Sequence, residues 1–330
     1  MEWKNIRHTH HLPNKSPISE KTHTGPYNIS TSTGTLAINP IEEITNSYNQ
    51  RRPRTVTKLQ NHPSRHLIRY PDTIVIISML PQILLIGATG RTGSLVLSEA
   101  LTRGHSVTIL LRKPNSNLPQ DHANLTTVTG DPCNASDVEK ALRSCSSTRP
   151  DVPVVIISTL GQTRTSGNPW AATTSPARFM DTSAKAVLAA AVSSKAVTNT
   201  KTGSSSSSPS GVQVHQIEIV KLVVMSMFGV GDSFANLNFA LRWTFNHSNM
   251  DQTLEDQTLV DQTVRNGNLP YVLVRPVILN EGEAAPVKVY ASSAEGVGFM
   301  PKISVKSVAK FLVDAASKGD WDGTAPVIAN

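Results

Sequence analysis

The chain has 330 residues, of which 38% are hydrophobic and 5% aromatic, and both shares are low for a chain that packs a core throughout. Its net charge is +7, and residues 1–78 carry most of it, with ten Lys or Arg against five Asp or Glu. No apolar run approaches the ~20 residues that cross a bilayer, so we expect no membrane span and no membrane partner. The remainder of the chain is close to neutral, which excludes a uniformly basic protein.

The N-terminal segment is polar, and residues 1–71 show neither the helical nor the strand period. Such a segment buries too little apolar surface to offset the entropy of ordering, so we expect residues 1–78 to be a disordered basic extension. A basic tail can touch nucleic acid or acidic lipid, but no aromatic residues alternate with these charges, and we expect no nucleic-acid partner. Because Met79 directly precedes the first predicted core strand, residues 1–78 could also stem from an upstream start.

The chain contains two cysteines, Cys133 and Cys145. Their spacing matches neither a metal-ligand pattern nor a disulfide framework. This favours a reduced, cytoplasmic location, and we expect no metal site.

From residue 79 on, short apolar runs alternate with helical patterns. Strands are predicted at 83–86, 107–111, 126–129, 154–157, 222–225 and 271–274. Helices are predicted over about 12 residues after the first strand, then at 137–142, 176–191, 254–265 and 305–316. Strands that alternate with helices indicate an α/β fold, a Rossmann-type doubly wound parallel sheet spanning residues 79–330. Residues 196–214 include a run of serines and are predicted to be a flexible insertion.

Two helix ends have local signals. Ser136 precedes the helix at 137–142 as a candidate N-cap, and Gly104 suits the end of the first helix. The inward stripe of that first helix is predicted to be Leu95, Val96, Ala100 and Leu101.

A glycine-rich turn joins the first strand to the first helix. Its glycines permit a tight turn, close approach of the backbone to a pyrophosphate and close packing of helix on strand. The N-terminus of the helix then offers free N–H groups to phosphates. The turn predicts a dinucleotide site made by Gly87, Thr89, Gly90, Arg91, Thr92 and Gly93.

The end of the second strand indicates which dinucleotide binds. An acidic residue there would favour NAD, whereas this chain has Arg112 followed by Lys113. A guanidinium at this place attracts the 2′-phosphate of NADP, and Arg91 can add a second one. We therefore expect NADP(H) rather than NAD(H). The alternative for Arg112 is an exposed charge at a strand end.

Two further strand ends are candidate cofactor contacts. Asp131 either accepts a hydrogen bond from the adenine amino group or caps the next turn. Leu160 and Gly161 follow the fourth strand and should pass under the cofactor, because ligands of open α/β sheets lie beyond the carboxyl ends of the strands.

These motifs resemble the atypical short-chain dehydrogenase/reductases, and most of all their NmrA-like and biliverdin reductase B (flavin reductase)-like branch. The resemblance rests on Ile83–Gly93, Arg112, Gly130-Asp131, the Val-Val-Met-Ser around 223–226 and Val274-Arg275-Pro276, and covers about residues 80–328. It implies NADP(H) bound over the sheet and a small substrate pocket built by residues 276–330. Pro276 should then lie against the nicotinamide end.

The sequence departs from that family in its acid–base residues. The wider superfamily uses a Tyr-x-x-x-Lys pair, and no tyrosine of this chain has a lysine four residues on. By resemblance, Ser226 stands at the end of the fifth strand near the nicotinamide. It either orients substrate or cofactor as the candidate catalytic residue, or bonds local backbone.

The helix before the sixth strand also carries several carboxylates, which either reach the pocket or form a solvated face, and the solvated face is favoured: Asp251, Glu255, Asp256 and Asp261. Arg275 in the sixth strand contacts either the pocket floor or an acidic neighbour.

The sequence thus predicts an NAD(P)H-dependent reductase of a small quinone-, flavin- or carbonyl-like substrate. Such an acceptor needs no strong protein acid, which fits the missing pair, and the cofactor supplies the hydride. The alternative is a non-catalytic NADP-binding redox sensor of the NmrA type that regulates a protein partner. An isomerase or epimerase is disfavoured by the same missing pair.

Overall fold

The computed structural model describes residues 55–58, 65–70, 73–78, 80–115, 118, 122–196 and 217–330. The predicted serine-rich insertion lies outside the described residues apart from Ala196. Most of the predicted N-terminal extension lies outside them as well.

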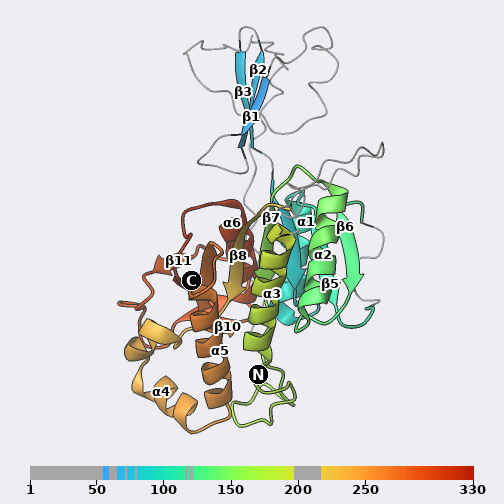
Figure 1. The fold of residues 1–330 in the computed structure, drawn as a ribbon. Helices are drawn as coiled ribbons and strands as arrows, with labels where there is room; N and C mark the ends of the chain where they lie inside the picture. The colour runs from blue at the N-terminus through green and yellow to red at the C-terminus, as the bar shows by residue number, and fades with distance from the viewer. Residues whose placement is uncertain are drawn as a thin grey trace, which may run out of the picture. The chain divides into compact units, whose positions relative to one another are not determined.

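The centre of the fold is an eight-stranded sheet in the order β11-β13-β9-β8-β7-β4-β5-β6 (Figure 1). Its strands are β4 (Gln82–Ile86), β5 (Val107–Leu111), β6 (Leu125–Thr129), β7 (Val154–Ser158), β8 (Ile219–Met225), β9 (Tyr271–Pro276), β11 (Lys288–Tyr290) and β13 (Val327–Ala329). Neighbouring strands are parallel except β11 and β13. The strand order reverses at β4, which lies between β5 and β7, and this is where an open α/β sheet binds its ligand.

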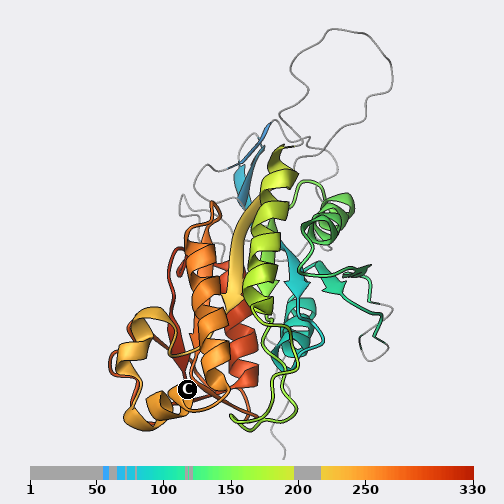
Figure 2. The same ribbon diagram turned by 60° about the horizontal axis from the view of Figure 1, so that its bottom comes forward.

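Helices cover both faces of this sheet. On one face lie α1 (Arg91–Thr102) and α6 (Val305–Ser317), and on the other α2 (Ala135–Thr148), α3 (Phe179–Ala196) and α5 (Met250–Arg265). Figure 2 shows α3 and α5 side by side. Both faces are covered because the strands are apolar on both sides. In β4, Ile83 and Leu85 pack into one core, and Leu84 and Ile86 pack into the other. The predicted doubly wound parallel sheet is confirmed.

The first helix has the predicted length of 12 residues. It buries Val96, Leu97 and Ala100, and the predicted Leu95 and Leu101 are partly buried against the same core, so the predicted stripe holds and lacks only Leu97. Gly104 follows the helix with φ +83°, a left-handed conformation that glycine adopts without strain, as predicted for this end.

The second helix differs from its prediction. It begins at Ala135 and runs to Thr148, and its N-cap is Asn134, whose side chain accepts a hydrogen bond from the Ser136 N–H. Ser136 therefore is not the cap. Asn and Ser cap helices about equally well, so the sequence alone did not separate them.

Several short elements around the sheet were not predicted. They are the helix α4 (Phe239–Asn246), the 3₁₀ helix η1 (Gly231–Asn236) and the parallel pair β10 (Ile278–Asn280) and β12 (Lys302–Ser304). Each is too short to show a hydrophobic period, and two of them, α4 and β10, line the candidate substrate pocket described below.

Three further strands lie within the segment that we expected to be disordered. β1 (Thr55–Lys58), β2 (Arg65–Tyr70) and β3 (Thr73–Ser78) form a separate antiparallel sheet. The β-branched run at 73–77 favours a strand, and the sequence analysis missed it. Residues 1–54 lie outside the described residues.

Candidate functional site: a nucleotide cleft and an apolar pocket

The glycine turn between β4 and α1 has the geometry that the sequence predicts. Gly87 has φ +92°, and the Gly90 N–H donates to the Gly87 carbonyl at 3.0 Å. A Cβ at position 93 would lie 2.0 Å from that same carbonyl oxygen, so only glycine fits. The turn therefore brings the first turn of α1 directly against β4.

The N-terminus of α1 is left open to a ligand. Its N-cap is Gly90, no side chain caps it, and no acidic residue lies in its first turn. By contrast, α2 and α6 are capped by Asn134 and Ser304. The free N–H groups and the positive end of the helix dipole make this terminus suited to a phosphate.

Thr159, directly after β7, holds the turn from the neighbouring strand and was not predicted. Its Oγ1 lies 3.2 Å from the carbonyl oxygens of both Ile86 and Gly87, and its N–H donates to Ile86 at 2.9 Å. A hydroxyl residue directly after a buried strand is the one signal that could have found it.

A cleft of about 460 Å³ opens beside the glycine turn at the carboxyl ends of β4, β5 and β7. Four predicted cofactor residues line it, namely Gly87, Thr89, Arg112 and Leu160. Arg112 is exposed, and its guanidinium carbon lies 5.6 Å from the centre of the Phe179 ring. The cation thus stands at the edge of the cleft on a flat aromatic surface, which keeps it available to an anion.

The remaining predicted cofactor residues belong to α1 and to the segment after β7. Thr92 is buried at the start of α1, whereas Gly161 is exposed, with nothing within 4 Å of an added Cβ. Arg91 is the first residue of α1, and its Nη1 pairs with Glu281 Oε1 at 3.1 Å. In this structure the guanidinium of Arg91 is therefore engaged by a carboxylate of the chain itself.

Asp131 takes the second of its two predicted roles in this structure. Its Oδ1 accepts a hydrogen bond from the Cys133 N–H at 2.9 Å, which caps the turn after β6. Its own N–H donates to Asp137 Oδ2 at 2.9 Å. Contact of Asp131 with an adenine stays a prediction.

A second hollow, of about 390 Å³, lies at the carboxyl ends of β8 and β9. The residues that line it are almost all apolar: Pro169, Met225, Ser226, Met227, Phe228, Leu241, Thr244, Phe245, Met250, Pro276, Val277, Ile278 and Leu279. No charged side chain of the described residues lines it. We call this hollow the apolar pocket. The pocket wall from α4 is not predictable from the sequence, because only the tertiary fold brings that helix to the strand ends.

Two hydroxyl residues line the apolar pocket, and of these Thr244 donates to the Ala240 carbonyl within α4, whereas Ser226 is free to meet a ligand. The residue is buried, its N–H donates to the Val274 carbonyl at 2.7 Å, and its Oγ has no hydrogen-bond partner among the described residues. A buried hydroxyl without a partner costs roughly 1–3 kcal/mol. Because this Oγ belongs to a residue that lines the pocket, a bound molecule can supply the missing partner. Pro276 lines the same pocket.

The carboxylates of α5 do not line either hollow. Asp251 and Glu255 are exposed, as the prediction of a solvated face requires. Asp256 is buried and accepts hydrogen bonds from the Met180 and Asp181 N–H groups, so it caps α3. Asp261 is also buried. The solvated face is therefore wrong for these two residues.

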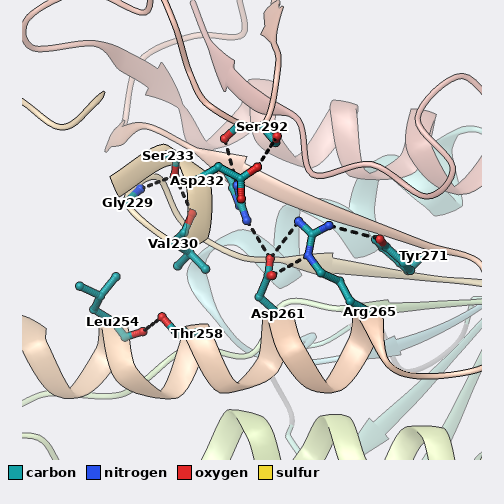
Figure 3. A network of polar contacts seen from close by, with 11 residues as sticks. Gly229, Val230, Asp232, Ser233, Leu254, Thr258, Asp261, Arg265, Tyr271 and Ser292 are labelled. Carbon is teal, nitrogen blue, oxygen red and sulfur yellow. Dashed lines mark hydrogen bonds and ion pairs between the residues drawn. The ribbon is translucent and has the colours of Figure 1, made fainter. Parts of the chain in front are cut away.

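Asp261 of α5 and Arg275 of β9 form a buried ion pair, with Arg275 Nη2 2.8 Å from Asp261 Oδ1. Figure 3 shows Asp261 facing Arg265, which in turn reaches Tyr271, while Asp232 meets Ser292. Arg275 also donates to the Ser292 carbonyl at 3.0 Å. Of the two alternatives for Arg275, the acidic neighbour is the one observed. The Ser292 hydroxyl, with which Asp232 is hydrogen-bonded, lowers the pKa of that carboxyl.

Other chemistry finds little support in the described part of the chain. Burial raises the pKa of both Cys133 and Cys145 to about 11, so neither thiol is an activated nucleophile at neutral pH. No group of three His, Cys, Asp or Glu side chains suited to a metal ion occurs among these residues. None of their helices is long and apolar enough to cross a membrane.

The cleft, the open helix N-terminus and the glycine-only contact at position 93 together fit a nicotinamide dinucleotide, with its phosphates at the turn. Comparison with known families agrees. A family model described as NAD(P)H-binding matches residues 87–318, and the chain belongs to this family. A search of curated proteins found no match.

Solved structures share the fold. ChuY, an anaerobillin reductase from Escherichia coli O157:H7, is similar at 19% identity, with a TM-score of 0.53 over 75% of this chain and 96% of its own. A short-chain dehydrogenase/reductase from Veillonella parvula, in complex with NADP, is similar at 17% identity, with a TM-score of 0.52 over 76% and 95%. The oxidoreductase ylbE from Lactococcus lactis has 16% identity and a TM-score of 0.53 over 76% and 90%. The resemblance to atypical short-chain dehydrogenase/reductases is confirmed, and at these identities the structural likeness shows the fold alone.

Proposed function

We propose that the chain is an NADP(H)-dependent oxidoreductase that reduces a small, uncharged quinone-, flavin- or carbonyl-like substrate in a reduced, cytoplasmic compartment. The observation that carries this proposal is the partnerless buried hydroxyl of Ser226 in the apolar pocket. The pocket lies at the same edge of the sheet as the glycine turn. One protein of the same fold, ChuY, is an anaerobillin reductase, and a reductase on this fold supports the proposal.

Each part of the site has a role in this proposal. The glycine turn and the N-terminus of α1 bind the pyrophosphate, and Arg112 binds the 2′-phosphate. The cofactor, when bound, supplies a hydride. The apolar walls exclude water, and the Ser226 hydroxyl donates a hydrogen bond to the carbonyl oxygen of the substrate and so orients it.

The proton that accompanies the hydride limits the choice of substrate. No titratable side chain of the described residues lines the apolar pocket. Ser226 donates a hydrogen bond but is a poor acid. The pocket therefore suits an acceptor that holds the added electron pair without a protein acid, as a quinone or flavin does.

A turnover assay tests the proposal. The full chain is mixed with NADPH and a panel of quinones, flavins and aldehydes, and loss of the nicotinamide absorbance is followed. Turnover of a quinone or flavin is expected. Absence of turnover, combined with equal binding of NADP⁺ and NADPH, would instead favour the NmrA-type sensor, which the lack of a titratable group in the pocket also suits.

The choice of NADP over NAD is tested at Arg112. Replacing Arg112 by Glu should weaken NADP⁺ binding at least about tenfold, since a charge-assisted bond to phosphate becomes a repulsion, and should change NAD⁺ binding little. Both affinities are measured by isothermal titration. Arg143→Glu on α2, which lines neither hollow, is the matched charge control. Equal losses for both cofactors would remove Arg112 from the 2′-phosphate site.

The role of Ser226 is tested against a second buried hydroxyl that has no partner. Ser226→Ala should lower kcat/KM roughly five- to hundredfold, because the substrate loses one buried hydrogen bond. Among the described residues, Ser194 on α3 also has a buried Oγ without a partner, but it does not line the pocket. Ser194→Ala should leave kcat/KM unchanged. Equal effects in the two variants would contradict a role for Ser226 in the reaction.

A further inference from the structure

The ion pair between Arg91 and Glu281 joins two parts of the site that are 190 residues apart in the chain. Arg91 is the first residue of α1 and directly follows Gly90 of the glycine turn, and Glu281 directly follows β10. The charged atoms are 3.1 Å apart, and both side chains are more than half exposed, at 56% and 71%. The pair is therefore accessible to any ligand that reaches the turn.

Glu281 is held in place by its own turn. Asn280, the last residue of β10, accepts a hydrogen bond from the Gly282 N–H at 2.8 Å through its side-chain Oδ1. This turn places Glu281 at its tip. The preceding residues Ile278 and Leu279 line the apolar pocket. Glu281 thus extends from the pocket wall to the N-terminus of α1.

This carboxylate stands where the bound cofactor brings negative charge. The phosphates of a dinucleotide need the open N-terminus of α1, and Arg91 is the cation nearest to it along the chain. A phosphate offers a guanidinium more acceptor oxygens than one carboxylate oxygen does. An exposed carboxylate–arginine pair contributes little stability and is readily exchanged.

We infer that Glu281 lowers the affinity of the chain for its cofactor. Its carboxylate pairs with the Arg91 guanidinium in the free protein and is displaced from it by a phosphate of NADP(H). The inference rests on the proposed binding of these phosphates at the glycine turn. Binding then costs the ion pair and brings Glu281 close to a like charge. Both effects weaken cofactor binding. Displacement also releases Glu281 from Arg91. Because Glu281 follows the pocket residues Ile278 and Leu279, this release couples cofactor binding to the apolar pocket.

The experiment measures the Kd of NADP⁺ for the full chain by isothermal titration at about 20 mM and about 200 mM salt. Glu281→Gln should tighten binding roughly two- to fivefold at low salt, and the gain should shrink at high salt. Glu283→Gln is the matched control. Glu283 lies on the same segment, but it pairs with Lys306 at 2.5 Å and should leave the Kd unchanged.

A second background separates exchange from plain repulsion. In Arg91→Gln, the Glu281→Gln change should lose most of its effect, because no cation remains to be released. If the gain is the same in that background, or if Glu281→Gln binds no more tightly than the wild type, the inference is wrong while the proposed function stands. A wild-type chain that binds no NADP⁺ would overturn both.

Discussion

Replacing Gly93 by Ala is expected to weaken cofactor binding strongly while α2, α3 and the rest of the sheet stay folded. The added Cβ would lie 2.0 Å from the Gly87 carbonyl oxygen and 2.7 Å from Thr159 Oγ1. No side-chain rotation relieves a contact with backbone, so α1 must move away from β4. Overpacking of this kind costs about 1–3 kcal/mol, and the displaced N–H groups no longer meet the phosphates. We expect the affinity for NADP⁺ to fall roughly tenfold to hundredfold.

The measurement is the Kd of NADP⁺, with thermal unfolding recorded on the same samples. Gly167→Ala is the matched control, since it makes the same chemical change with nothing within 4 Å of the new Cβ and Gly167 lines neither hollow. It should bind NADP⁺ like the wild type. A Gly93→Ala chain that is folded and binds NADP⁺ normally would mean that the phosphates lie elsewhere.

The parallel sheet was predictable because its strands are buried on both faces. A strand such as β7 then begins with a continuous apolar run, Val154–Ile157, and the helices between strands carry their own stripes. The glycine turn was predictable for a related reason. Its requirement is local, since Gly87 and Gly93 touch each other within one strand–turn–helix unit.

The features that the sequence did not predict depend on residues far apart in the chain. Asp251, Asp256 and Asp261 begin three identical Asp-Gln-Thr triplets, yet one is exposed, one caps α3 and one pairs with Arg275. No local pattern separates them, because the five-residue spacing turns each to a different side of α5. The Arg91–Glu281 pair and the α4 wall of the apolar pocket are hidden in the sequence for the same reason.

The largest effect on stability is expected at Asp261. Asp261→Asn leaves the fully buried Arg275 guanidinium without its carboxylate, and the Arg275 Nε already lacks a hydrogen-bond partner in the part of the chain that the structure describes. Breaking a buried pair from one side costs about 3–5 kcal/mol, because a buried charge stays uncompensated. The free energy of unfolding, measured in urea, should fall by that amount. Arg265→Gln removes the other, more exposed partner of Asp261 and should cost no more than about 1 kcal/mol.

The double variant Asp261→Asn with Arg275→Met distinguishes charge from packing. If the penalty arises from the uncompensated guanidinium, removing that guanidinium should restore part of the loss, and the double variant should be more stable than Asp261→Asn alone. A double variant as unstable as the sum of its parts would show that Arg275 acts through packing against the loop at Gly231, where an added Cβ would lie 2.8 Å from Arg275 Nη2. Arg275 is followed by Pro276, the last residue of β9, and by Val277, and both of these line the apolar pocket, so the buried ion pair anchors the strand that carries the pocket wall.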